Sequence, residues 1–394
     1  MTRLVLLAGL VLTLAACQEQ LSAPADCPAS CPGGRAEALD TVILADLQRD
    51  STFEGFIPAL SGGSALVSTG LPDFDARAVF RFSGIPDSFG LTGIRRGYTI
   101  DSIVVNMTVL ERDTAAKSLE LLLYRVPATT DTAFSYADAL AASGGTPTLR
   151  VPLVDTLRTG VARVLLTGAQ LAPLAIAPAD SGEIAFVVGL SSATPTGVRL
   201  QNNNALTSLT NLVHYIRLIG VDSLSTRQIL TGTPEFVSYV ASARPPAPSG
   251  ALVVGGEPSS RSVLRFTLPR VIRDSAALVR ATLELVPVGP ITGVPNLPTL
   301  LSVRSVLADF GAKSPLETGS TTQPVPAGSA DTVRVEVGRI VSQWQGPNGR
   351  VQTIFLQTSP EGASWSRFAF GSSAGTQRPR LRITYLRAFP FEAP

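Results

Sequence analysis

Histidine, lysine and cysteine are scarce in this chain of 394 residues, and their scarcity excludes several kinds of chemistry. The only histidine, His214, lies in the strand-like segment LVHYIRLIG, where we expect a structural or sheet-surface residue rather than the base of a Ser-His-Asp arrangement. The segment EGASWS does not form a Gly-x-Ser-x-Gly elbow, and no Gly-rich phosphate loop ends in Lys-Ser or Lys-Thr. We therefore expect a protein that is not an enzyme.

Charge of either sign is also low. Charged residues make up 16% of the chain, and the formal net charge is +2. Lysine occurs only at Lys117 and Lys313, and no run of basic residues stands out. Because nucleic-acid-binding surfaces concentrate lysine and arginine on one face, we expect no nucleic acid among the partners.

Carboxylates are present, but the sequence does not pair them. A glycosidase needs two carboxylates that flank a cleft, and Asp73, Asp75 and Glu257 are candidates. They lie in loops beside turn residues, where acidic residues are common. Asp73 and Asp75 could instead help to bind a structural calcium ion, since loop carboxylates are calcium ligands. Solvated turn carboxylates are the simpler interpretation, and no other cofactor is predicted.

The N-terminal segment is strongly apolar. The run from Leu4 to Ala16 follows Arg3 and is shorter than the roughly 20 residues that span a membrane, so it suits a secretory signal peptide. Its ending, Leu-Ala-Ala-Cys, resembles the lipobox of bacterial lipoproteins. That resemblance implies that Cys17 becomes the first mature residue and carries acyl chains such as palmitate. Gln18 replaces the Asp that favours inner-membrane retention in that family, which implies an outer-membrane location. The alternative is an ordinary signal peptide with an incidental cysteine.

A segment rich in Pro, Ala, Gly and Ser follows, and its composition predicts a flexible tether. It contains Cys27 and Cys31, which could form a local disulfide in an oxidising compartment. Free thiols are one alternative. A metal site is another, but it would need further ligands, and the one histidine is distant in sequence.

Beyond the tether, apolar and polar residues alternate. RAVFRFSGI places Phe80 and Phe82 on one face and Arg81 on the other. Period two with one apolar face indicates half-buried antiparallel strands, and many short strands between turn residues are typical of a sandwich or barrel. Helical periodicity is scarce, although residues 131–143 could form a short helix. The other alternating segments are IDSIVVNMTVLE, GEIAFVVGL, RSVLRFTLP, DTVRVEVGR and RLRITYL.

The chain also repeats itself. ARAVFRFSGIPDS resembles SRSVLRFTLPRVIRDS, and VHYIRLIG resembles PRLRITYL. Matching pieces occur in the same order in both halves, which indicates two tandem copies of one domain. We predict an all-β chain with two tandem antiparallel β-sandwich domains of the jelly-roll kind. The expected divisions are a signal peptide at 1–16, a lipidated N-terminus and tether at 17–39, and β-sandwich domains at 40–220 and 221–394.

Particular motifs mark the second half. They are an early SVLRFTLP strand, a Trp before an Asn-Gly turn in WQGPNG, a late FAFGSS element and a closing RPRLRITY strand. This order resembles the DNRLRE-type, carbohydrate-binding-module-like jelly-roll domains of secreted bacterial proteins. Many members carry a charged residue where Ser373 and Ala374 stand here, and the first half matches more loosely. The resemblance therefore implies a fold more than a function. The matching residues are Leu264, Arg265, Phe266, Trp344, Asn348, Gly349, Phe370, Ser372, Pro379, Leu381 and Tyr385.

The chain has two tryptophans, and exposed aromatic rings are the usual platform for sugar binding. If the segment around Trp365 is a strand, Trp365 points away from the face of Phe368 and Phe370, so it is the predicted ligand platform. The alternative is that Trp365 packs under a loop or against the neighbouring domain. Trp344 follows a short amphipathic turn and is expected in the core.

We therefore expect a non-enzymatic lipoprotein of the cell envelope that binds polysaccharide at the cell surface through its β-sandwich domains. The lipid on Cys17 would hold it to the membrane. The alternative is a structural or assembly component that contacts another envelope protein through a strand edge or an apolar patch.

Overall fold

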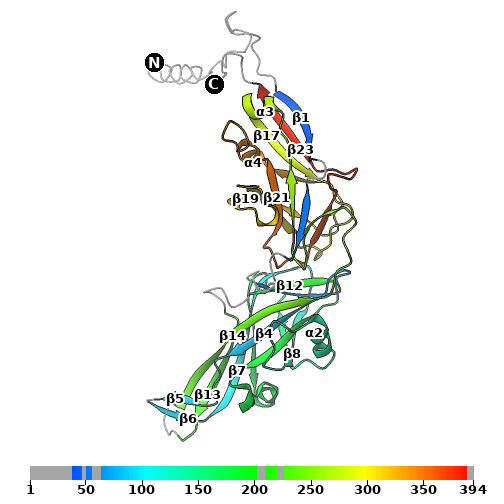
Figure 1. Ribbon diagram of the computed structural model, residues 1–394. Helices are drawn as coiled ribbons and strands as arrows, with labels where there is room; N and C mark the ends of the chain where they lie inside the picture. The colour runs from blue at the N-terminus through cyan, green and yellow to red at the C-terminus, as the bar shows by residue number, and fades with distance from the viewer. Residues whose placement is uncertain are drawn as a thin grey trace, which may run out of the picture.

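The computed structural model describes residues 38–46, 50–55, 64–91, 93–201, 209–220 and 226–387. Across these ranges the chain is all-β and β-sandwich-like, and it is built from antiparallel sheets, as predicted (Figure 1). None of the helices in these ranges is long and apolar enough to span a bilayer. The signal peptide, Cys17, Cys27 and Cys31 lie outside the described residues, and the statements about them remain predictions.

Most strands before residue 242 belong to one sheet of ten strands, which we call the β3–β14 group. A small hairpin, β5 with β6, extends from it. The strands are β3 (Ser64–Thr69), β4 (Ala76–Ser83), β5 (Phe89–Leu91), β6 (Ile94–Arg96), β7 (Tyr98–Arg112), β8 (Leu119–Val126), β9 (Leu149–Leu153), β10 (Gly160–Thr167), β11 (Ile184–Ser191), β12 (Thr196–Gln201), β13 (Asn211–Leu218) and β14 (Arg227–Ala241).

The later strands form two sheets, which we call the β15–β23 group, and two early strands join them. The later strands are β15 (Leu252–Gly255), β16 (Ser260–Arg265), β17 (Ala276–Leu285), β18 (Thr299–Val306), β19 (Leu316–Val325), β20 (Val333–Glu336), β21 (Thr353–Ser359), β22 (Arg367–Phe370) and β23 (Arg380–Arg387). The early strands are β1 (Ala38–Leu44), which pairs with β23, and β2 (Ser51–Glu54), which pairs with β16.

The two groups share one order of neighbouring strands. The β3–β14 group contains the runs β9-β8-β11-β4 and β10-β7-β13, and the β15–β23 group contains β19-β18-β21-β16 and β20-β17-β23. The pair β3-β12 likewise corresponds to β15-β22. The strand β14 pairs with both β13 and β4, and β1 with β2 occupies the equivalent place beside β23 and β16.

This pairing corrects the expected boundaries at 40 and 220. Strands β1 and β2 were expected in the first domain, but their partners β23 and β16 are in the β15–β23 group. Strand β14 was expected in the second domain, but it pairs with β13 and β4 of the β3–β14 group. The closing strands are β14 in one group and β1 with β2 in the other. They lie outside the repeated order of the sequence, so matching the repeats could not assign them.

Each group has its own hydrophobic cluster of inward side chains. Phe80 and Phe82 in β4 are buried in the first cluster, as their alternation with Arg81 predicts. Trp344 is buried in the second cluster against Phe266, as expected. The first cluster also contains Val294, Ala363 and Trp365 from the β15–β23 group, so apolar packing continues between the groups.

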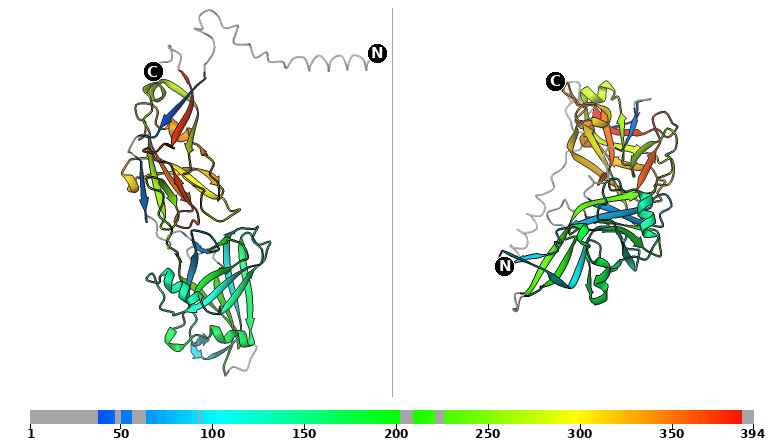
Figure 2. Two further views of the ribbon diagram at one scale, coloured as in Figure 1. Left: turned by 90° about the vertical axis from the view of Figure 1, so that its right-hand side faces the viewer. Right: turned by 60° about the horizontal axis from the view of Figure 1, so that its bottom comes forward.

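The helices are short. They are α2 (Tyr136–Ser143), within the segment expected to be helical, the 3₁₀ turns η3 (Gly168–Leu174), η4 (Pro178–Asp180) and η6 (Gly311–Lys313), and α3 (Arg270–Ser275) and α4 (Gly338–Ser342). The two strand groups are stacked end to end (Figures 1 and 2). Strands β1 and β23 lie at one end of the molecule, and the β5–β6 hairpin lies at the other, which we call the distal end.

Candidate functional site

The prediction that Trp365 is an exposed ligand platform is wrong. Its side chain is 2% exposed, and it lies in the loop before β22 rather than in a strand. The guanidinium of Arg199 lies 5.2 Å from its ring centre, and the ring packs against Gly197. Trp365 packs in the hydrophobic cluster of the β3–β14 group, in agreement with the alternative interpretation that it packs against the neighbouring domain.

A polar network surrounds this junction. Arg244 donates to the Trp365 carbonyl at 2.5 Å, and its guanidinium lies 4.0 Å from the ring centre of Phe74. Burial, followed by the nearby charge of Arg367, lowers the pKa of Arg244 to about 10. These contacts join the two groups, and a cavity of about 510 Å³ beside them is lined by Arg244, Tyr239 and Glu257 among others.

Glu257, one of the carboxylates considered for glycosidase chemistry, belongs to this network. Its Oε2 lies 2.8 Å from the hydroxyl of Tyr239, which also lies 2.9 Å from the Gly362 carbonyl. Burial raises the pKa of Glu257, while the Tyr239 hydrogen bond and then Arg244 lower it in part. The partners of Glu257 are a tyrosine and an arginine, so the geometry is that of a structural contact between the groups.

Asp73 and Asp75 do not meet further metal ligands. Asp75 accepts from Arg77 Nη1 at 2.5 Å and from the Tyr136 hydroxyl at 2.7 Å. Burial, followed by the hydrogen bond to Asp75, raises the pKa of Tyr136 to about 12. Among the residues that the structure describes, no three His, Cys, Asp or Glu side chains gather into a group that could hold a metal ion.

The sequence also contains a Gly-x-Ser-x-Gly string that sequence reasoning did not single out, GSSAG at 371–375. Its central Ser373 is fully buried, and its hydroxyl donates to Asp50 Oδ1 at 2.8 Å. The string connects β22 to β23 rather than a strand to a helix, so it is not a nucleophile elbow.

The distal end of the β3–β14 group offers a different pair of surfaces, one on each face of β13. On the outer face, Tyr215 pairs with Ile229 of β14, and the two side chains are 37% and 56% exposed. Arg217, two residues along the same face, donates to Asp101 at 3.2 Å and is itself exposed. An aromatic ring beside polar groups on an open sheet face is a geometry that suits a sugar ring.

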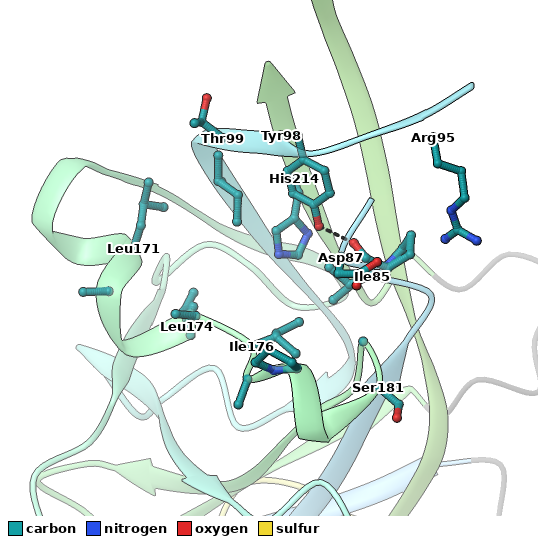
Figure 3. A pocket seen from close by; sticks show the side chains of 17 residues that line it. Ile85, Asp87, Arg95, Tyr98, Thr99, Leu171, Leu174, Ile176, Ser181 and His214 are labelled. Carbon is teal, nitrogen blue, oxygen red and sulfur yellow. Dashed lines mark hydrogen bonds between the residues drawn. The ribbon is translucent and has the colours of Figure 1, made fainter. Parts of the chain in front are cut away.

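The inner face of β13 lines a cavity of about 850 Å³ (Figure 3). Strands β7 and β13 and the segment from Ile85 to Asp87 form one side, and η3 with the following residues forms the other. Gly182 fixes the wall between them: its φ is +81°, and a Cβ there would stand 2.6 Å from the Ile85 carbonyl oxygen. A backbone contact this close and a positive φ both favour glycine.

His214 is the buried polar group of this cavity. Leu212, His214, Ile216 and Leu218 all face inward along β13. Leu212 belongs to the main cluster, whereas Ile216 and Leu218 belong to a small cluster at the distal end, so His214 stands between the two. It is 2% exposed, and its Nδ1 has no hydrogen-bond partner among the described residues. Burial lowers the pKa of His214, and a hydrogen bond to the backbone of Leu212 raises it in part, so the imidazole is uncharged at neutral pH.

Polar groups also mark the cavity's mouth. The Tyr98 hydroxyl donates to the Pro86 carbonyl, and burial, followed by the charge of Asp87, raises the pKa of Tyr98. Arg95 donates through Nε to the Ser88 hydroxyl at 3.0 Å, and that hydroxyl donates to Asp87 at 2.9 Å. One cation and one anion therefore face each other across a serine.

The sequence signal for this site was the position of His214 among inward leucines and isoleucine, because a strand core rarely contains a histidine.

Comparison with known proteins does not assign the chain to a family. No family model and no curated protein matches the chain. The C-terminal domain of the Streptococcus pyogenes antigen I/II-family protein AspA is 10% identical, with 89% of this chain and 91% of that chain covered, at a TM-score of 0.14. A structure described as BspA_C_mut is 11% identical, with 90% of this chain and 84% of that chain covered, at a TM-score of 0.10. At such TM-scores neither likeness carries an argument about this chain.

Proposed function

We propose that the chain is a non-enzymatic lipoprotein of the bacterial outer membrane that binds polysaccharide at its distal end. The lipobox-like ending at Cys17 supports the anchor, and the resemblance of the second half to DNRLRE-type domains supports the ligand class. The observation that carries the proposal is the placement of Tyr215. Tyr215 is an exposed aromatic residue of β13. Strand β13 lies toward the end of the molecule opposite to β1, the described strand nearest the anchor (Figure 1).

In this proposal the two strand groups have different roles. Strand β1 follows the tether and is built into the β15–β23 group, which therefore stands next to the membrane. The β3–β14 group then projects away from the membrane and carries the open face with Tyr215 and Ile229. A ring of this kind stacks on the apolar face of a sugar, and Arg217 can donate to its hydroxyl groups.

Retention on insoluble and gel-embedded polysaccharides tests this proposal. The full chain is used with Cys17→Ser, which prevents lipidation. Retention that falls at least about tenfold in Tyr215→Ala would support the glycan site, since a tenfold change corresponds to about 1.4 kcal/mol. The matched control is Phe310→Ala, because Phe310 is also an exposed aromatic, 70% exposed, but belongs to the β15–β23 group. The proposal of a glycan site at Tyr215 would be overturned if the chain were retained on no polysaccharide, or if both variants lost retention equally.

A second function, contact with another envelope protein, is favoured by the same apolar pair. Tyr215 and Ile229 lie side by side on neighbouring strands, as an apolar contact patch would. In cells, crosslinking from this face to one defined protein, abolished by Ile229→Asp and unaffected by Phe310→Ala, would support that function over glycan binding.

A further inference from the structure

The cavity on the inner face of β13 lies between two hydrophobic clusters of the β3–β14 group. A volume of about 850 Å³ falls within the range of about 300–1,000 Å³ that is usual for small-molecule sites. It lies between the main hydrophobic cluster, which includes Leu174, and the distal cluster, which includes Ile216 and Leu218. A ligand in this position would therefore contact apolar side chains on both sides.

The walls of the cavity carry aliphatic side chains on two sides, together with polar residues such as Thr99 and Ser181. Leu171, Leu174 and Ile176 line it from η3 and the residues that follow, and Ile85 lies across from them (Figure 3). Ile100 of β7 also lines it. Among the Phe, Trp and Tyr side chains that the structure describes, Tyr98 alone lines it, and its hydroxyl donates to the Pro86 carbonyl. Aliphatic side chains on two sides, without a free aromatic platform for stacking, suit a hydrocarbon chain better than a sugar ring.

Charge does not select the ligand. Asp87 and Arg95 line the cavity with opposite charges and are bridged by the Ser88 hydroxyl. The mouth therefore has no net charge from this pair. An ionised ligand would gain one favourable contact and one unfavourable contact there, so an uncharged ligand fits best.

One polar atom inside the cavity remains to be satisfied by a ligand. His214 Nδ1 is buried and has no partner among the described residues, and the ring points into the cavity beside Tyr98 (Figure 3). A backbone carbonyl can only accept, so the hydrogen bond to Leu212 uses the one N–H of the neutral imidazole, and the unpartnered Nδ1 is an acceptor. A hydroxyl group can donate to this nitrogen, whereas an ether cannot.

We propose that this cavity binds an uncharged aliphatic chain that carries a hydroxyl group, with the chain packed against Leu171, Leu174 and Ile176 and the hydroxyl bonded to His214. The site is separate from the outer face of Tyr215 and goes beyond the polysaccharide function. No covalent step is involved.

The single histidine makes a direct test possible, because histidine labelled with ¹³C and ¹⁵N gives one imidazole spin system in the NMR spectrum. The full chain with Cys17→Ser is titrated with 1-octanol, and octyl methyl ether, which cannot donate a hydrogen bond, is the matched ligand. We expect saturable shifts of the His214 imidazole signals and tighter binding of the alcohol. In His214→Leu, saturation transfer from protein to octanol should report affinity weaker by about tenfold, the effect of one lost hydrogen bond.

Two blocking variants and one control locate the site. Ala175→Trp and Ala172→Phe each add bulk to a residue that lines the cavity, and either one that keeps the wild-type melting temperature should abolish the shift. Tyr215→Ala, on the other face of the same strand, should leave it unchanged. The proposal is overturned if His214 does not shift up to the solubility limit of octanol, or if the shift survives in a folded blocking variant. Loss of octanol binding with retained polysaccharide binding would refute this site alone.

Discussion

Gly197 of β12 lies against the indole of Trp365 so closely that a Cβ on Gly197 would stand 2.8 Å from both Cε2 and Nε1 of the ring. Val294 Cγ2 would be equally close. Neither a rigid indole nor a packed valine moves freely, so we expect Gly197→Ala to strain the junction and lower the free energy of unfolding by about 1–3 kcal/mol. Chemical denaturation measures this. Gly145→Ala, where a Cβ meets nothing within 4 Å, is the control and should change stability little.

Truncation of Trp365 tests its corrected role. Because the side chain is buried between the strand groups, Trp365→Ala should lower the free energy of unfolding by about 3–5 kcal/mol. Phe310→Ala removes an exposed aromatic ring and should stay within about 0.5 kcal/mol of the parent. Equal stability of the two variants in a urea titration would contradict the buried placement of Trp365.

His214 should make stability depend on pH. Burial depresses its pKa below the ordinary value of 6.5, so below about pH 6.5 the unfolded chain takes up a proton that the folded chain does not. The free energy of unfolding should therefore fall as pH drops through 6.5, and the fall should end below the folded pKa. The raised pKa of Glu257 gives a slope of the opposite sign at lower pH.

The difference between the parent and His214→Phe isolates the histidine, because Glu257 is present in both. We expect the difference in unfolding free energy to vary with pH only in the window below 6.5. An NMR titration of the imidazole that gave a pKa at or above 6.5 would contradict the buried, uncharged state.

Tyr239 should control the ionisation of Glu257. In Tyr239→Phe the carboxylate loses the hydrogen bond that lowers its pKa, so the pKa of Glu257 should rise further. Leaving a half-buried group unpaired should also cost about 1–3 kcal/mol of stability. Titration of the labelled Glu257 carboxyl carbon by NMR measures the first effect. The exposed Tyr215→Phe should change neither quantity, and an unaltered Glu257 pKa in Tyr239→Phe would disprove the coupling.

Alternation in the sequence predicted several strands, and in β4 and β20 it also predicted which face is buried, whereas β11 and β16 are buried on both faces. Phe80 and Phe82 are inward and flank Arg81, and β23 begins directly after Pro379, whose missing N–H suits the start of a strand. Local patterns of this kind depend only on neighbouring residues, so a sequence carries them directly.

Packing between segments that are distant in sequence could not be predicted in the same way. The alternation of side chains along a strand predicted that Trp365 points away from Phe368 and Phe370. Alternation cannot show that a second strand group covers Trp365 on that side. The same limit applies to β14, which follows the first repeat in sequence but completes its sheet. His214 was expected as a structural or sheet-surface residue, and whether a histidine in that strand is packed or lines a cavity depends on η3, 40 or so residues earlier in the chain.

The pairing of β1 with β23 fixes an order for the chain's assembly. Thr384 donates to Asp40 at 2.5 Å although 344 residues separate them. A ribosome or translocase delivers β1 first and β23 last, so the sheet that contains both strands stays open until β23 has emerged. The β3–β14 group has its closing strand, β14, immediately behind it and can complete its sheet earlier. The sheet that holds the first described strand is thus the last to be completed.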